Sequence, residues 1–102
     1  MRIAEVIGTV TLNRAHPSLT GACLKLAVPL SLAETRGAAE PAADPLVVYD
    51  ELGAGIGSRI AISEGREAAQ PFWPQDKPLD AYNAAILDRV DIGITEEQLR
   101  DK

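Results

Sequence analysis

The sequence has few of the residue types that most site chemistry requires. It contains one cysteine and one histidine in 102 residues, so a single chain can form neither a disulfide nor a His/Cys zinc cluster. Acidic residues outnumber basic ones by 15 to 10, which argues against broad contact with a nucleic-acid backbone. No apolar run approaches the ~20 residues of a membrane-spanning helix, and the first residues lack the order of a secretory signal. These absences predict a cytosolic protein without nucleic-acid or membrane partners.

Aromatic residues are also scarce, at 4% of the chain, so most of the core must come from Val, Ile, Leu and Ala. Small aliphatic side chains bury less apolar area per residue than aromatic ones. Because each Å² of buried apolar area contributes roughly 25 cal/mol, such a core stabilises the subunit less. We therefore expect additional burial between subunits. The length suits one domain, and we assign residues 1–102 to it.

Apolar residues with a period of two predict five short strands. They cover residues 2–12, 22–30, 46–51, 59–63 and 80–92. The first strand has Ala4 and Val6 on its core face, yet Ile3 and Ile7 make its other face apolar too. We expect a small closed or partly open β-barrel.

Alternation is cleanest in the second strand, where Leu24, Leu26 and Val28 share one side and Ala27 lies on the other. Pro29 cannot donate to a ladder, so this strand should end or reach a sheet edge there. In the last strand, Ala84, Ile86 and Val90 share a face.

The remaining segments predict loops and short helices. Ser63 should cap a short helix over residues 64–70, and residues 33–45 should form an exposed hairpin loop. Thr95 to Gln98 has the spacing of a capping box. Phe72 and Trp73 lie in a proline-rich segment and could cover a hydrophobic edge or a neighbouring subunit.

A glycine-rich loop separates the third and fourth strands. Its residues are Gly53, Ala54, Gly55, Ile56 and Gly57. A dinucleotide-binding loop needs a helix after it, whereas a strand follows here. The favoured interpretation is a tight strand connection in which glycine supplies positive φ.

No set of reactive residues indicates catalysis. His16 lies beside a proline in a loop, and Cys23 lies on the less apolar side of a strand. The carboxylate pairs Asp50/Glu51 and Asp88/Asp91 show no sign of the desolvation that separates acid from base. We predict no catalytic, cofactor-binding or metal residues and no enzyme activity.

Four segments in order resemble the EutN/CcmL family of bacterial microcompartment vertex proteins. Residues 1–10 (MRIAEVIGTV) are similar to the opening strand of that family, and residues 16–26 (HPSLTGACLKL) to its turn into the second strand. Residues 49–57 (YDELGAGIG) resemble its glycine stretch, and residues 77–88 (KPLDAYNAAILD) its closing strand.

The resemblance implies a five-stranded OB-like barrel with one short helix, assembling as a cyclic pentamer at the vertices of a shell. It implies that the glycine loop, Gly53 to Gly57, frames a narrow pore at the fivefold axis. Implied partners are further copies of the chain and the hexameric shell proteins of the same compartment. Candidates for the subunit interface are Ile3, Ile7, Asp50, Arg59 and Trp73.

Departures from the family pattern bear on the compartment type. Ser58 and Arg59 follow the loop where an acidic residue is usual, and with the proline-aromatic segment this favours a catabolic compartment over a carboxysome. Two alternatives stay open: an OB-like binding module for oligonucleotide or oligosaccharide, and a small hydrolase that uses carboxylates.

Overall fold

Five strands close into a barrel in a computed structural model that describes residues 1–12, 17–19, 21–65, 68, 70–73 and 79–93. They are β1 (Arg2–Val10), β2 (Leu24–Pro29), β3 (Leu46–Tyr49), β4 (Arg59–Glu64) and β5 (Ala81–Ile86), in the spatial order β1-β2-β3-β5-β4. β3 and β5 pair in parallel through Tyr49 and Tyr82, and the other neighbours are antiparallel. The predicted fold class, a small five-stranded barrel with one short helix, is confirmed.

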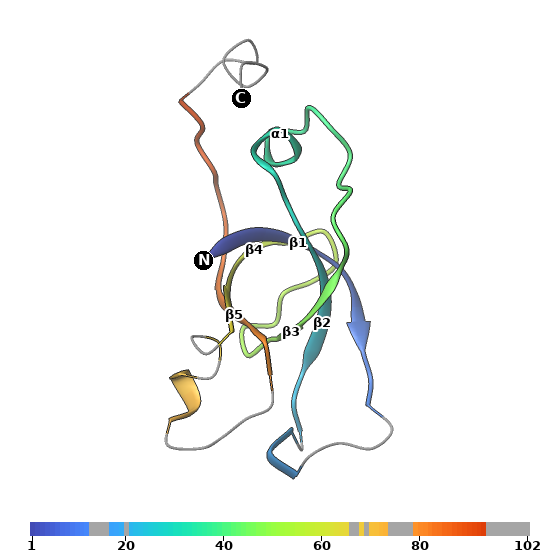
Figure 1. The fold of residues 1–102 in the computed structure, drawn as a ribbon, viewed down its shortest axis with the longest axis vertical. Coiled ribbons are helices and arrows are strands. Elements are labelled where there is room, and N and C mark those ends of the chain that lie inside the picture. The colour runs from blue at the N-terminus through green and yellow to red at the C-terminus, as the bar shows by residue number, and fades with distance from the viewer. Residues whose placement is uncertain (13–16, 20, 66–67, 69, 74–78, 94–102) are drawn as a thin grey trace.

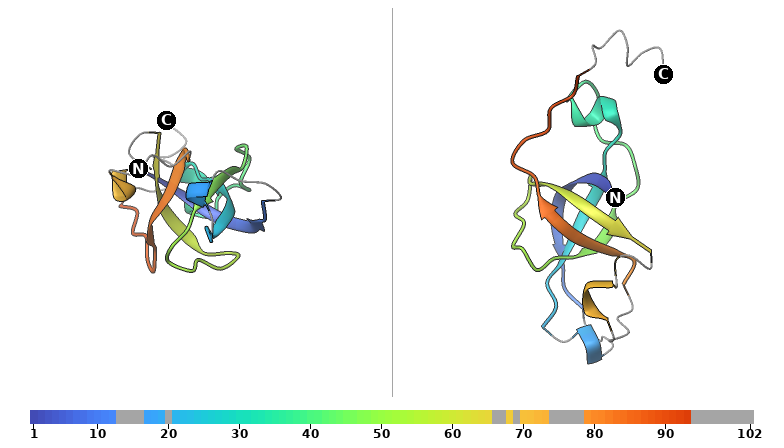
Figure 2. Two further views of the ribbon diagram at one scale, coloured as in Figure 1. Left: turned by 90° about the horizontal axis from the view of Figure 1, so that it is seen from below. Right: turned by 90° about the vertical axis from the view of Figure 1, so that its left-hand side faces the viewer.

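Short helical segments lie at the two ends of the barrel (Figures 1 and 2). The helix α1 (Leu32–Thr35) lies at one end, and two 3₁₀ turns, η1 (Pro17–Leu19) and η2 (Gln70–Phe72), lie at the other. No helix among the described residues is long and apolar enough to cross a membrane.

The interior of the barrel is narrow and filled by small aliphatic side chains. Its core cluster consists of Ala4, Val6, Ala27, Val48, Ala54, Ile60, Ile62 and Ala81. Half of these residues are alanines, which fits a small barrel whose opposite walls lie close together. The expectation that most of the core is aliphatic agrees with this cluster, and Tyr49 is the aromatic residue that is also buried among the described residues, at 8% exposure.

The more apolar side of β2 lies outside the barrel core cluster, although Leu24 and Val28 on that side are buried. Ala27 belongs to the core cluster and pairs with Val6 of β1, whereas Leu26 pairs with Gly8 and with Val47, which is 45% exposed. The register of β1 and β2 shifts between Val6 and Gly8, so Ile7 occupies an irregularity in the ladder. Such a shift exchanges the two faces of a strand.

Two predictions about where helices begin are wrong. Ser63 does not cap a helix, because Ser63 and Glu64 lie within β4 and pair with β5. Ala68, within the helix predicted over residues 64–70, is helical, and residues 66, 67 and 69 lie outside the described residues. The helix α1 overlaps the start of the stretch predicted as a hairpin loop, residues 33–45, and Ser31 caps it in a capping box with Glu34. Residues 36–45, which follow α1, are exposed as expected.

The last strand is shorter than predicted and uses its other face. β5 ends at Ile86, and its buried residues are Ala81 and Asn83, whereas Ala84 and Ile86 are exposed. The third strand ends at Tyr49 because Asp50 begins the next loop. His16 and the predicted capping box over residues 95–98 lie outside the described residues.

Candidate functional site

Asp50 organises the loop between β3 and β4 from inside the subunit. Its Oδ1 accepts hydrogen bonds from the Leu52 backbone N–H at 2.9 Å and from Asn83 Nδ2 at 2.9 Å, and its Oδ2 accepts from the Ala54 N–H at 2.8 Å. Asp50 is only 2% exposed. A carboxylate that accepts two backbone donors of its own loop fixes the path of that loop.

The hydrogen bonds outweigh the cost of burying this carboxylate. Burial alone would raise the pKa of Asp50, but the donors from Asn83, Leu52 and Ala54, with the charge of Lys25, leave the pKa below its ordinary value. Asp50 is therefore an ionised structural group at neutral pH.

The glycine loop is attached to the barrel at both ends and open at its tip. Gly57 N–H donates to the Val6 carbonyl at 2.7 Å, and Val6 N–H donates to the Ser58 carbonyl at 2.9 Å. Ala54 is 1% exposed and belongs to the barrel core, whereas Ile56 is 74% exposed. The loop projects from one side of the barrel, at the left of the right-hand view in Figure 2.

Positive φ requires glycine at two positions of this loop. Gly53 and Gly57 have φ values of 76° and 90°, a region that side chains with a Cβ rarely adopt. Gly55 has ordinary φ and an open surrounding, with Ser58 Oγ at 4.0 Å from an added Cβ. A side chain is therefore tolerated at Gly55 within the subunit.

The other predicted interface residues lie in different surroundings. Ile7 and Trp73 are exposed, at 43% and 77%, and Ile3 is half-buried. The Arg59 guanidinium donates to the Thr35 carbonyl at the end of α1. Because Asp50 is buried, it could act on an interface only through the loop that it shapes.

Three aromatic rings pack together beside this loop, an arrangement that the sequence analysis missed. Phe72 meets Tyr49 and Tyr82 edge-on, with ring centroids 4.9 and 5.5 Å apart, and the two tyrosines stack at 6.3 Å. The Tyr82 hydroxyl donates to Glu51 Oε2 at 3.1 Å, and burial, followed by this bond, raises the pKa of Tyr82. These rings contact one another instead of forming an open stacking platform.

The described residues contain no group of three His, Cys, Asp or Glu side chains placed to hold a metal ion. Cys23 is exposed. It lies with Lys25 and Asp50 in a hollow of about 400 Å³ next to the glycine loop.

Comparison with known proteins gives consistent matches. The family described as "Ethanolamine utilisation protein EutN/carboxysome" matches residues 1–88. The carboxysome shell vertex protein CcmL of Synechocystis is 33% identical over 90% of this chain and 87% of its own length. The microcompartment shell vertex protein PduN of Salmonella typhimurium is 32% identical over 86% of this chain and 96% of its own.

A solved structure shares the barrel. The pentameric microcompartment shell protein GrpN of Rhodospirillum rubrum superposes with a TM-score of 0.74 and 30% identity, covering 90% of this chain and 99% of that one. The barrel order, the loop shaped by Asp50 and these matches lead to one conclusion: the chain belongs to the EutN/CcmL family of bacterial microcompartment vertex proteins.

Proposed function

We propose that this protein is a structural subunit that forms homopentamers and caps the vertices of a bacterial microcompartment shell in the cytoplasm. The observation that carries the proposal is the near full-length likeness, in sequence and fold, to a pentameric shell protein. A closed ring of identical subunits presents one surface to the next copy and needs no catalytic group.

The glycine loop would frame the opening at the fivefold axis. Five copies of a loop approach closely at such an axis, so small residues at the tip are favoured. Asp50 and the bonds to Val6 would hold the five loops in the same conformation. Because a side chain at Gly55 is compatible with the subunit, Gly55→Trp should narrow the opening without unfolding the chain. An unchanged axial opening in the structure of that variant would contradict this placement.

Hexameric shell proteins of the same compartment are the proposed neighbours of the pentamer. We propose a catabolic compartment, and the support is the segment around Phe72 and Trp73. Arg59 adds no support for this compartment type, because its guanidinium donates to the Thr35 carbonyl and does not extend from the glycine loop. Co-purification with hexameric shell proteins of a catabolic compartment, and not with those of a carboxysome, is the expected result.

Molar mass in solution tests the central proposal. A pentamer of 10.9 kDa chains has about five times that mass, 54.5 kDa, and size exclusion with light scattering should give a single peak there. A monomer that persists at high concentration would contradict the shell function. Retention of that monomer on single-stranded nucleic acid at low salt would then favour the OB-like binding module.

A further inference from the structure

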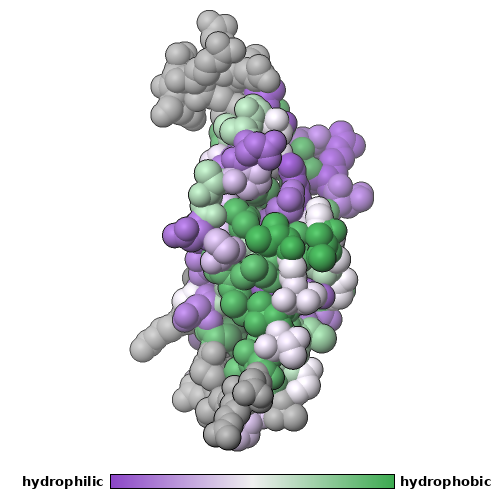
Figure 3. All heavy atoms as spheres, turned by 90° about the vertical axis from the view of Figure 1, so that its right-hand side faces the viewer, coloured by the Kyte–Doolittle hydropathy of each residue, from purple (hydrophilic) through white to green (hydrophobic). Residues whose placement is uncertain are grey.

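An unusually apolar surface covers the outside of β1, β2 and β3. The outer face of an antiparallel sheet ordinarily carries polar residues when it faces water. Here Gly8, Leu26 and Val47 form one cross-strand row, and Ile7 and Leu12 nearby are 43% and 42% exposed. Figure 3 shows the apolar band that results along this face of the molecule.

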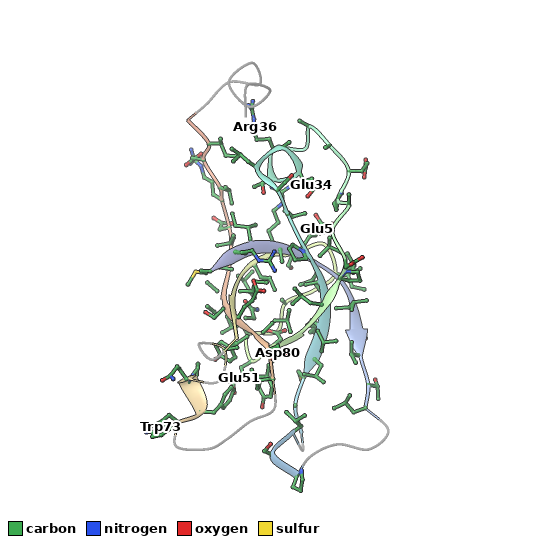
Figure 4. The ribbon with its side chains drawn as sticks, viewed as in Figure 1. Glu5, Glu34, Arg36, Glu51, Trp73 and Asp80 are labelled. Atoms are coloured by element: carbon green, nitrogen blue, oxygen red, sulfur yellow. The ribbon has the colours of Figure 1, made fainter. Side chains whose placement is uncertain are left out.

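A second exposed apolar feature lies on the other side of the molecule. Trp73 follows η2, and its side chain is 77% exposed. It projects from the left-hand edge in Figure 4, whereas Figure 3 looks onto the right-hand side of the same orientation. Phe72 next to it packs against Tyr49, so η2 is attached to the barrel and presents Trp73 at a fixed place.

A closed ring requires two such surfaces. Each subunit of a cyclic pentamer contacts its two neighbours through different patches, which must lie on different sides and complement each other. An interface of ordinary size covers about 800 Å² on each partner, so two interfaces would cover roughly a quarter of the 6844 Å² surface of the chain. Tryptophan is enriched at the centres of such interfaces.

We propose that Trp73 of one subunit packs on the outer face of β1 to β3 of the next, with its indole on the row formed by Gly8, Leu26 and Val47. This inference rests on the proposed pentamer and names its contact surfaces. Gly8 suits the position because it leaves a flat place between larger apolar residues, where a ring can lie against the sheet. Its φ is ordinary, and an added Cβ would meet only Leu26 Cβ, at 3.9 Å.

Gly8→Glu tests the receiving face. The new side chain fits the isolated subunit, but it would place a charge under the indole of the neighbour, so the pentamer peak should give way to monomer. Ala39→Glu adds the same charge in the exposed segment after α1 and should leave the mass at five chains. Circular dichroism should show the same fold for both variants.

Trp73 supplies a second readout because it is the one tryptophan in the sequence. The fluorescence emission of Trp73 in the wild-type pentamer should lie at shorter wavelength than in monomeric Gly8→Glu. Acrylamide should also quench this fluorescence severalfold less in the pentamer. Trp73→Ala should raise the concentration at which half of the chain is assembled by at least about tenfold, and Trp73→Phe by less. A side chain so exposed in the subunit has little part in its folding.

The outcomes separate the two proposals. A wild-type monomer would overturn both the pentamer and this contact. A wild-type pentamer whose Trp73 is quenched as readily as in the monomer would leave the pentamer in place and overturn the contact. Normal assembly of Gly8→Glu or of Trp73→Ala would also overturn it.

Discussion

Two loops of this molecule are organised by a carboxylate in nearly the same way. Asp50 accepts from the backbone N–H groups of Leu52 and Ala54 in the glycine loop. Glu34 accepts from Ser31 N–H at 2.8 Å and from Ala42 N–H at 3.0 Å, and so joins α1 to the segment that follows it.

The two carboxylates differ in burial. Asp50 is buried with Asn83 beside it, whereas Glu34 lies at the outer end of the molecule near Arg36 (Figure 4). If Glu34 is removed, water can accept hydrogen bonds from the N–H groups that it leaves. If Asp50 is removed, the donors buried beside it have no other acceptor, and this costs free energy. Two carboxylates with the same hydrogen-bond pattern can therefore differ in what they contribute to the free energy of unfolding, because that contribution depends on whether water reaches the site.

Removing the buried carboxylate should have the largest effect. Asp50→Ala leaves the Ala54 N–H and the Asn83 amide unpaired, and the free energy of unfolding should fall by about 3 kcal/mol. Urea denaturation of the purified protein measures this change. A loss below about 0.5 kcal/mol, the size expected for an ordinary surface substitution, would show that Asp50 does not hold the loop.

Asn83→Ala should have a smaller effect, which measures how much of the stabilisation by Asp50 comes from its hydrogen bond with Asn83. The variant removes one donor to Asp50, but it also removes Asn83 Oδ1, a buried acceptor with no hydrogen-bond partner among the described residues. We expect a fall of about 1–2 kcal/mol in the same urea measurement. A fall as large as that of Asp50→Ala would instead make Asn83 the main support of the loop.

Acid should reduce the contribution of Asp50 to the stability of the folded chain. The folded pKa of Asp50 lies below that of the unfolded chain, about 3.9. Its contribution is therefore complete above that value and is lost as pH falls through the folded pKa. Stability between pH 7 and pH 5 should be unaffected by this group. Below about pH 4 the decline should be shallower in Asp50→Asn than in wild type, and parallel declines would contradict the assignment.

Glu34→Gln should act locally. The pKa of Glu34 lies below its ordinary value because Ser31 N–H, and then Ala42 N–H, donate to it. Loss of the charge should speed hydrogen exchange at the Ala42 amide while the urea midpoint moves less than in either Asp50 variant. Unchanged exchange at Ala42 would show that the bond seen in the structure contributes little to order in this segment.

The smallest effect is expected at the exposed ion pair between β1 and β4. Arg2 Nε and Glu64 Oε1 lie 2.5 Å apart, with about half of the arginine side chain and a third of the glutamate side chain exposed. Arg2→Ala should cost about 0.5 kcal/mol or less at physiological salt. A loss comparable to that of Asn83→Ala would mean that good geometry can offset exposure, and that burial is not what separates the effects of Asp50 and Glu34.

The sequence predicted the elements of the fold better than their faces. Strand positions followed from β-branched periodicity, and Pro29 ended β2 as expected. The orientation of β2 did not follow from its alternation, because a barrel this narrow takes the small Ala27 into its core cluster while the larger Leu26 stays outside that cluster. Ladder irregularities at Ile7 and between Ala61 and Ile62 depend on pairing between distant segments.

The glycine loop was found from its residues, but its support was not. Asp50 and Asn83 are 33 residues apart, and no local pattern marks them as partners. By contrast, Ser31 and Glu34 have the spacing of a capping box, a local signal in the sequence that marks the start of α1. The place of Ser63 depends on its pairing with β5, which no local signal shows.

The pairing of β3 and β5 has a mechanical consequence. The barrel is joined there by a single pair, Tyr49 and Tyr82, and the ring cluster with Phe72 lies over the same seam. The barrel is thus a curled sheet whose two edges, β3 and β5, are held together mainly by one ladder pair and three packed rings. Transient opening should begin between these two strands before the long ladders of β1 separate. A force that pulls the two ends of the barrel wall apart should therefore separate β3 from β5 first, and the barrel should close again when the three rings regain contact.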